Sequence, residues 1–405
     1  MEEDTMKAIR KLTGRALQGL FKEMRGEPFK VVYADGSVDQ YGEGAARFTV
    51  SFRADDVFNL WSGDLSVSLG EAYMNGQLDV EGDLADLVAV ALRSGVLSGN
   101  TMPGGLTRTV LRRAGGARSL ARQKLDIEHH YDLGNDFFSL WLDDSLTYSC
   151  AYFRHASDPL ERAQQQKVQH SLAKLRLEPG ESLLDVGCGW GALVMEAAER
   201  FGVQALGITL SNEQNAGARA AIEARGLWDR AMVRLVDYRT LAREGRQFDK
   251  IVSIGMIEHV GKAHLGEFVE DVKTMLRPGG LALLHLITGT QDGPINRWVE
   301  KYIFPGGYIP TVAEMLKHLS EREFHVWDVE NLAPHYRLTL DAWSERFERA
   351  VPLIRDKFGE RFVRMWRLYL RGFSAGFREC RLEVHQILVS RGKPQGLPLT
   401  REDLY

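Results

Sequence analysis

The chain has 405 residues, with 51 basic and 55 acidic side chains and a formal net charge of −4. This length indicates two domains, and the near balance of charge gives the chain no overall electrostatic preference for a particular partner. No stretch approaches the ~20 consecutive apolar residues of a membrane-spanning helix, and the acidic start is the opposite of a signal peptide. Three separated cysteines give neither a disulfide framework nor a metal-binding pattern, so we expect a soluble cytoplasmic protein without a metal site.

Residues 1–95 are expected to form a small α+β domain. Its first 25 residues interleave apolar and basic side chains at helical spacing, which predicts a basic amphipathic helix. A hairpin is expected to begin at Phe29, because Asp35-Gly36 is a favoured turn sequence. The other elements are expected at Phe48–Phe52 (a strand), Ser68–Asn75 and Leu84–Leu92 (both helices).

Residues 96–124 are rich in glycine and arginine and are expected to form a linker. No acidic residue lies between Asp86 and Asp126, whereas seven arginines and lysines do. Together with the basic first helix, this segment suits an anionic bilayer surface. A solvated face on ordinary helices is the alternative. Nucleic acid is less favoured as a partner, because no known nucleic-acid-binding module accompanies the charge.

Residues 125–405 alternate between strand and helix patterns, which predicts an α/β sheet covered by helices on both faces. Strands are expected at Leu183–Val186, Ala205–Leu210, Met232–Val236, Lys250–Ile254, Leu281–Ile287 and Val384–Ser390. Helices are expected at Gly191–Phe201, Asn212–Arg225, His264–Leu276, Leu340–Phe358 and Glu360–Glu379, with an insertion at Gly289–Leu319.

The strongest motif follows the first of these strands. Asp185 ends the strand, and Gly187, Gly189 and Gly191 then alternate with a cysteine and a tryptophan before a helix begins. Glycine lets the backbone approach a ligand closely, at the edge of the sheet where such folds bind nucleotides. The spacing is tighter than the dinucleotide fingerprint and resembles motif I of class I S-adenosylmethionine (SAM) methyltransferases. An ordinary glycine-rich turn is the alternative.

Polar residues also follow the next two strands, where the ribose and adenine of SAM are expected to bind. The expected ribose contacts are Thr209, Leu210, Ser211 and Gln214, and the expected adenine contacts are Asp237 and Tyr238. Taken singly, each polar residue fits a helix cap equally well. Their position behind the glycine turn favours SAM binding.

Five further segments resemble those of cyclopropane-fatty-acyl-phospholipid synthases and the related mycolic acid cyclopropane synthases. They begin at His129 (His-His-Tyr-Asp-Leu-Gly-Asn-Asp-Phe-Phe), Leu146 (Leu-Thr-Tyr-Ser-Cys-Ala-Tyr-Phe), Ser253 (Ser-Ile-Gly-Met-Ile-Glu-His-Val-Gly), Lys301 (Lys-Tyr-Ile-Phe-Pro-Gly-Gly-Tyr-Ile-Pro) and Phe377 (Phe-Arg). The resemblance implies a Rossmann-like, seven-stranded methyltransferase fold over residues 125–405. Residues 1–95 resemble the small N-terminal lipid-binding domain of the phospholipid enzymes, which the mycolic enzymes lack.

The resemblance also implies a set of site residues. A bound bicarbonate ion is expected as the base, and its holders match this chain at Cys150, Glu258, His285, the backbone of Ile287, and Tyr336. Tyr148 and Ser149 are expected against SAM. Taken singly, Glu258 fits a surface ion pair, His285 a core histidine and Cys150 a buried small residue.

Two details refine this expectation. An ionised Glu258 would repel bicarbonate, so we expect burial to keep it protonated, as its apolar neighbours suggest. Many relatives carry a cysteine four residues before the Phe-Arg pair, whereas this chain has Phe373 there. Covalent catalysis from that position is therefore excluded.

The sequence thus predicts an enzyme that adds a methylene group from SAM across a cis double bond of an unsaturated phospholipid acyl chain. We expect it to act as a homodimer at the inner face of the membrane. Methylation without ring closure, which would give a methylene- or methyl-branched chain, is the nearest alternative. A SAM-binding lipid-interaction module without turnover is an alternative of another class.

Overall fold

The computed structural model describes residues 18–53, 64–95, 134–394 and 396–404. It divides into two compact units. Unit 1 comprises the described parts of residues 1–116, together with 296–303 and 343–381, and unit 2 comprises the rest. The expected basic linker, and most of the expected basic first helix, lie outside the described residues.

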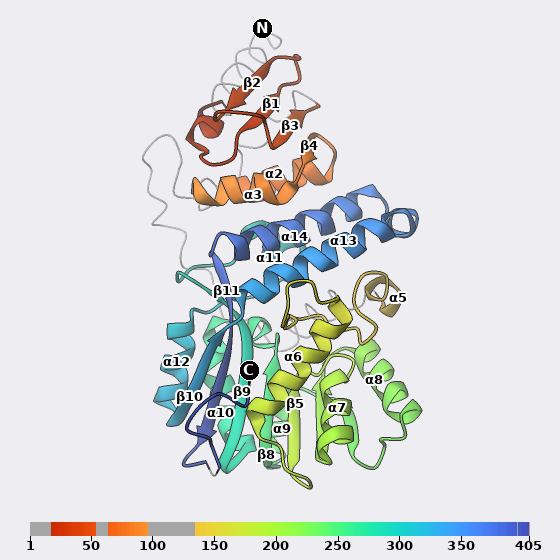
Figure 1. Ribbon diagram of the computed structural model, residues 1–405, viewed down its shortest axis with the longest axis vertical. Helices are drawn as coiled ribbons and strands as arrows, with labels where there is room; N and C mark the ends of the chain where they lie inside the picture. The colour runs from red at the N-terminus through yellow and green to blue at the C-terminus, as the bar shows by residue number, and fades with distance from the viewer. Residues whose placement is uncertain (1–17, 54–63, 96–133, 395, 405) are drawn as a thin grey trace. The chain divides into compact units, whose positions relative to one another are not determined.

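A seven-stranded sheet organises unit 2, with the strand order β10-β11-β9-β8-β5-β6-β7. Figure 1 labels its strands from β10 to β5. The neighbouring strands from β9 to β7 pair in parallel, and β11 pairs antiparallel with both β9 and β10. The strands are β5 (Ser182–Val186), β6 (Gln204–Thr209), β7 (Ala231–Leu235), β8 (Phe248–Ile254), β9 (Leu276–Gly289), β10 (Phe324–Asn331) and β11 (Leu382–Arg391). The expected doubly wound α/β class and its seven strands are confirmed.

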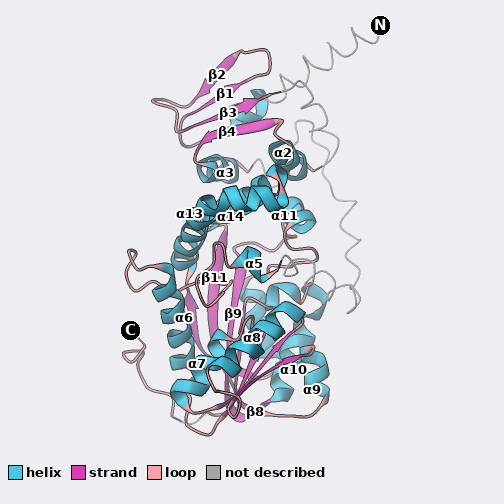
Figure 2. Cartoon of the chain, turned by 90° about the vertical axis from the view of Figure 1, so that its right-hand side faces the viewer, coloured by secondary structure: helices cyan, strands magenta, loops and turns pink. Residues whose placement is uncertain are grey.

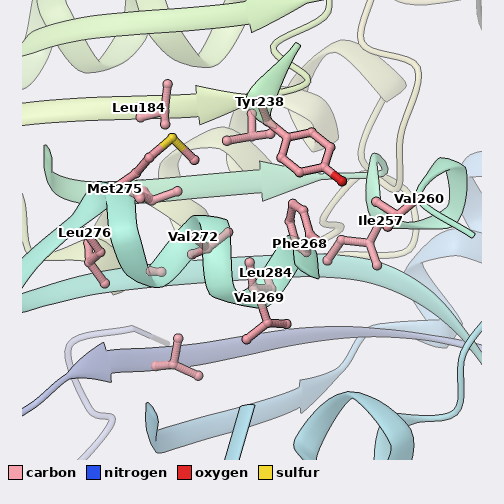
Figure 3. Packing of buried hydrophobic residues seen from close by; sticks show 14 of the residues in the cluster. Leu184, Tyr238, Ile257, Val260, Phe268, Val269, Val272, Met275, Leu276 and Leu284 are labelled. Atoms are coloured by element: carbon pink, nitrogen blue, oxygen red, sulfur yellow. The ribbon is translucent and has the colours of Figure 1, made fainter. Parts of the chain in front are cut away.

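Helices cover both faces of this sheet (Figure 2). One face carries α6 (Leu160–Leu175), α7 (Ala192–Phe201) and α8 (Asn212–Ala224), and the other carries α9 (Tyr238–Arg243), α10 (Leu265–Met275) and α12 (Val312–Glu321). Because side chains alternate along a strand, Leu183 and Leu184 enter opposite cores. Figure 3 shows Leu184 in the second core beside Met275 of α10. The two cores hold the strand ends, and hence the site, in fixed positions.

Several elements differ from the sequence-based expectation. The expected insertion Gly289–Leu319 contains α11 (Arg297–Tyr302) and most of α12. Helix α13 (Ala333–Phe358) begins well before Leu340, with Asn331 accepting a hydrogen bond from the first backbone N–H. The sequence analysis missed α6 and β10, and also the short helix α5 (Asn135–Phe138).

A smaller sheet lies in unit 1, with the strand order β2-β1-β3-β4. Its elements are β1 (Phe29–Val32), β2 (Val38–Tyr41), β3 (Phe48–Phe52), α2 (Leu65–Met74), β4 (Leu78–Gly82) and α3 (Leu84–Arg93). The hairpin, the third strand and both helices match the expectation, whereas β4 was missed. Phe29 and Phe48 stack in its core with ring centroids 5.1 Å apart.

Helix α14 (Glu360–Arg378) belongs to the same unit, although it lies far along the chain. Its arginines pair with carboxylates of the N-terminal segment. The pairs are Arg364 with Asp79 (2.6 Å), Arg371 with Asp83, and Arg378 with Asp86 (2.9 Å). Ala375 of α14 packs among Ala85 and Ala89 of α3. None of the helices in the described part of the chain has the length and apolar character needed to cross a membrane.

Candidate active site

The glycine-rich turn after β5 forms as the sequence predicts. Gly187, Gly189 and Gly191 have φ angles of 87°, 55° and 82°, which L-residues with a side chain adopt only under strain. A Cβ atom on Gly187 would also lie 2.9 Å from Cβ of Met256. The turn therefore requires glycine at this position for conformational and steric reasons.

A cavity of about 150 Å³ adjoins this turn in unit 2. Of the twelve residues predicted to bind the cofactor, those that line it are Tyr148, Ser149, Asp185, Gly187, Gly189, Thr209, Leu210, Gln214, Asp237 and Tyr238. Gly191 and Ser211 do not line it. They precede α7 and α8, where Ser211 caps α8 by accepting the backbone N–H of Gln214 at 3.3 Å. The structure thus gathers predicted residues from four separate segments around one space.

The loop that carries Tyr148 and Ser149 is fixed by hydrogen bonds to its backbone. Asp143 accepts the N–H groups of Ser145 and Thr147, both at 3.0 Å. Gln164 of α6 donates to the carbonyls of Thr147 and Ser149 at 3.2 and 2.9 Å. A loop held this way presents its side chains to a ligand without first having to become ordered.

The expected adenosine contacts are themselves hydrogen-bonded. Thr209 donates to Gln214 at 2.7 Å. Asp237 accepts two bonds from the guanidinium of Arg239, at 2.8 and 2.7 Å. Burial opposes ionisation of Asp237, but the bonds from Arg239 prevail and lower its pKa. Asp237 is therefore a charged hydrogen-bond acceptor at the cavity wall.

The ring of Tyr238 forms part of the cavity wall and of the core behind it. It meets Phe268 edge to face, with centroids 5.3 Å apart (Figure 3). The guanidinium of Arg239 lies 4.8 Å from the ring centroid. The aromatic position expected beside adenine is therefore rigid.

The sequence analysis missed a buried cation in this cavity. Lys167 of α6 is only 3% exposed and donates to Oγ of Ser149 at 3.0 Å. Burial lowers its pKa to about 8. Burial also raises the pKa of Asp185 to about 7, which the charge of Lys167 partly opposes. A lysine on a polar helix gives no motif signal in a single sequence, so it could be found only once the fold was known.

Glu258 lies in a short 3₁₀ turn after β8 and contacts a second predicted residue directly. Its Oε1 accepts the backbone N–H of Ile287 at 2.6 Å. Its Oε2 is buried and has no hydrogen-bond partner among the described residues. Burial raises the pKa of Glu258 to about 7, although the N–H of Ile287 opposes the shift. The expected protonation of this group near neutral pH agrees with that direction.

A chain of hydrogen bonds fixes which nitrogen of His285 carries its proton. Ser171 donates to the carbonyl of Lys167 at 2.8 Å, so its oxygen must accept from Gln386 (3.1 Å). This orients the amide of Gln386 with its NH₂ group toward Ser171 and toward Nδ1 of His285, 3.2 Å away. Nδ1 therefore accepts, and the proton of neutral His285 lies on Nε2.

His285 is consequently a donor rather than a base. Burial lowers its pKa to about 3, which keeps the ring neutral. Its Nε2 is buried and has no partner among the residues the structure describes. His285 and Ile287 are two positions apart on β9, so their side chains lie on the same face of the sheet.

Cys150 and Tyr336 are connected to this neighbourhood through Leu332, the residue before α13. The thiol of Cys150 lies 3.9 Å from the carbonyl of Leu332, one turn before Tyr336. The N–H of Leu332 bonds to Val384, which is the residue paired with Ile287 across β11 and β9. Burial raises the pKa of Cys150 well above its ordinary value, so this thiol is not a nucleophile.

Comparison with known proteins identifies the family of this chain. The family model described as mycolic acid cyclopropane synthetase matches residues 118–387. The chain belongs to this family. A second model, described as a domain of unknown function (DUF7884), matches residues 16–97.

Family members resemble the chain over different lengths. It is 40% identical to the "Probable fatty acid methyltransferase" of Pseudomonas putida, over 83% of this chain and 86% of that protein. It is 38% identical to the cyclopropane-fatty-acyl-phospholipid synthase of Escherichia coli K12, over 88% of this chain and 92% of that protein. The structure of the cyclopropane synthase MmaA2 from Mycobacterium tuberculosis matches with a TM-score of 0.63 and 32% identity, over 66% of this chain and 98% of that one.

The expected family, its class I SAM methyltransferase fold and its enzyme class are confirmed by these matches. A further structure, that of CmaA1 complexed with SAH and CTAB, matches with a TM-score of 0.63 and 33% identity, over 66% of this chain and 98% of that one. The chain is therefore a SAM-dependent methyltransferase of the cyclopropane synthetase family.

Proposed function

We propose that this enzyme transfers a methylene group from SAM to the cis double bond of an unsaturated phospholipid acyl chain, forming a cyclopropane ring. The observation that supports the phospholipid substrate is the extent of the match. The E. coli phospholipid enzyme matches over 88% of this chain, whereas the mycolic synthase MmaA2 matches over 66% of it. The segment shared with the former includes the N-terminal part of unit 1.

SAM is proposed to occupy the cavity beside the glycine turn. Its adenosine would lie against the ends of β6 and β7, where Gln214 and Asp237 offer polar contacts. The bound sulfonium would supply a strongly electrophilic methyl group. Such a donor is needed because a carbon–carbon double bond is a weak nucleophile. The chain's part is to hold the two reactants aligned.

The ring-closing step requires a base and a dry site. Once the alkene has taken the methyl group, a carbocation remains on the acyl chain, and water would convert it to an alcohol. Closing the ring requires loss of one proton from the transferred methyl. Cys150, His285 and the Oε2 atom of Glu258 are buried, which is suited to excluding water from this step.

The residues around β9 fit a small oxyanion. His285 presents an Nε2–H donor, and a protonated Glu258 presents a second donor at Oε2; both atoms are buried and without partners among the described residues. A bicarbonate ion held there, with Cys150, the backbone of Ile287 and Tyr336 around it, would supply the base for the methyl proton. Neutral donors suit this role because they lower the basicity of a bound anion less than a positively charged side chain would.

We also propose that the enzyme acts as a peripheral protein on the cytoplasmic face of the membrane, as a homodimer. The basic residues of segment 96–124 and of the first 25 residues would bind anionic headgroups. The protein is expected to sediment with anionic liposomes at low salt and to be released as salt rises. Binding that ignores both salt and lipid charge would contradict this docking.

The decisive experiment is incubation of the enzyme with SAM and dioleoyl phospholipid vesicles, followed by proton NMR of the extracted lipids. High-field cyclopropane signals, with one SAH released per ring, are expected. SAH release accompanied by olefinic methylene signals, and by no cyclopropane signal, would refute ring closure.

A second candidate is methylation without ring closure. The name of the P. putida relative favours it, and so does the "Tuberculostearic acid methyltransferase UfaA1" of M. tuberculosis, which is 33% identical over 91% of this chain. Hydrogenation of the product before mass analysis separates the two outcomes, because a methylene-branched chain takes up hydrogen under mild conditions that leave a cyclopropane intact.

A further inference from the structure

The cavity in unit 2 contains a buried pair of opposite charges. Its lining includes two carboxylates and two cationic side chains among the described residues: Asp185, Asp237, Lys167 and Arg239. Asp237 and Arg239 satisfy each other through a two-point contact. Lys167 and Asp185 have no such arrangement.

Among the described residues, Lys167 forms no ion pair within 4 Å, and the charges of Asp143 and Asp185 act on it from farther away. Its ammonium has three N–H donors, and the bond found for it among the described residues runs to the neutral hydroxyl of Ser149. A cation that is 3% exposed is costly unless an anion or several acceptors compensate it. Because Lys167 lines the cavity, a ligand can provide that anion.

The geometry points to one part of SAM. We propose that Lys167 binds the α-carboxylate of the methionine portion of SAM, with Asp185 beside it for the α-ammonium. This inference rests on the proposed placement of SAM in the cavity. With adenosine at β6 and β7, beside the Asp237–Arg239 pair, the charged groups left in the described lining of the cavity are Lys167, which is hydrogen-bonded to Ser149, and Asp185. The zwitterionic end of the ligand would therefore meet two opposite charges.

This placement also orients the transferable methyl group. Ser149, which accepts the bond from Lys167, is followed directly by Cys150 of the proposed base site. Anchoring the methionine tail at Lys167 therefore fixes the sulfur next to the segment that leads to Cys150. Lys167 is a binding and positioning residue in this scheme, and it takes no part in bond making.

The test compares SAH with its decarboxylated analogue, which keeps the ammonium and lacks only the carboxylate. Isothermal titration calorimetry would measure both ligands on the wild-type protein, on Lys167→Met and on Lys174→Met. Lys174 is a matched control because it is a buried lysine of the same helix that pairs with Glu330 (2.5 Å) and does not line the cavity.

The wild type is expected to prefer SAH by about 10- to 100-fold, the usual range for a hydrogen-bonded charge pair. Lys167→Met is expected to lose that preference through weaker SAH binding, with the analogue bound as before. Lys174→Met is expected to melt at a lower temperature but to keep the preference.

Two results would overturn the inference while leaving SAM in the cavity. The first is an unchanged preference in Lys167→Met. The second is equal binding of SAH and its decarboxylated analogue by the wild-type protein. This second test does not depend on whether any variant folds. A wild type that binds neither ligand would instead overturn the proposed cofactor site, and the inference with it.

Discussion

Replacing Glu258 with glutamine should reduce the pH dependence of folding stability. Burial raises the pKa of Glu258 from 4.5 to about 7. A pKa that is higher in the folded state favours folding when the group is protonated. This contribution is fully present below about pH 4.5 and is lost as pH rises through 7.

The size of the effect follows from the shift. At about 1.4 kcal/mol for each pH unit between the two pKa values, the whole contribution is about 3 kcal/mol. Between pH 5 and pH 8 the wild-type free energy of unfolding should therefore fall by about 2 to 3 kcal/mol on account of this group. Glutamine keeps the acceptor for Ile287 and an N–H donor in place of the protonated Oε2, so Glu258→Gln should lack this fall.

Urea unfolding of the wild type and of Glu258→Gln at pH 5 and pH 8 would measure this effect. The readout is how much more the free energy of unfolding falls between these pH values in the wild type than in the variant. Glu330→Gln is the control, because the pKa of Glu330 is shifted in the opposite direction, to about 2. Burial opposes this lowering, but the interactions of Glu330 with His170 and Lys174 outweigh the effect of burial. The stabilising effect of Glu330 is lost only as pH falls toward 2, so this variant should be destabilised almost equally at pH 5 and pH 8. Equal pH dependence in wild type and Glu258→Gln would refute the reasoning. Glu258→Gln should also retain much of the activity, because it mimics the protonated acid.

Three further substitutions test other parts of the structure. Gln386→Leu removes the donor that fixes His285, and should lower kcat about 10- to 100-fold in an SAH-release assay, with the calorimetric Kd for SAH unchanged. If Gln386→Leu instead weakened SAH binding by as much as it lowered kcat, the amide of Gln386 would be shown to support the cofactor site and not His285. Gly187→Ala should cost about 1–2 kcal/mol from backbone strain alone and weaken SAH at least tenfold; wild-type affinity would contradict the turn geometry. Arg364→Met removes the partner of Asp79 and two bonds to backbone carbonyls, and should lower the free energy of unfolding by about 2–4 kcal/mol in urea. A loss below 1 kcal/mol would mean that this pairing is not formed in solution.

The sequence predicted the elements that carry a simple local pattern, either a short apolar run or closely spaced glycines. The strands of the large sheet are short apolar runs, and the turn after β5 shows its glycines directly. Both were placed to within a few residues, except that β9 begins five residues earlier than expected, at Leu276. Cys150 and Tyr336 came from the family resemblance, because neither has a local signal of its own.

Helix α6 shows why the remainder could not be predicted. Its buried face mixes apolar residues such as Val168 and Leu172 with polar ones, namely Gln164, Lys167, His170 and Ser171. Periodicity analysis detects apolar stripes, so a helix that turns hydrogen-bonding groups inward resembles a loop. The residues that support the site were missed together with this helix. The tautomer of His285 likewise depends on residues from α6, β9 and β11, which are separated along the chain.

The composition of unit 1 has a practical consequence for work with fragments. The strands and helices near the N-terminus share a folded unit with α14, which is encoded almost at the other end of the gene. A catalytic fragment begun at the linker would expose on α14 an apolar surface and a row of uncompensated guanidinium groups. Such a protein is expected to aggregate or to require a polar redesign of that helix. Only an intact polypeptide satisfies both sides of this pairing.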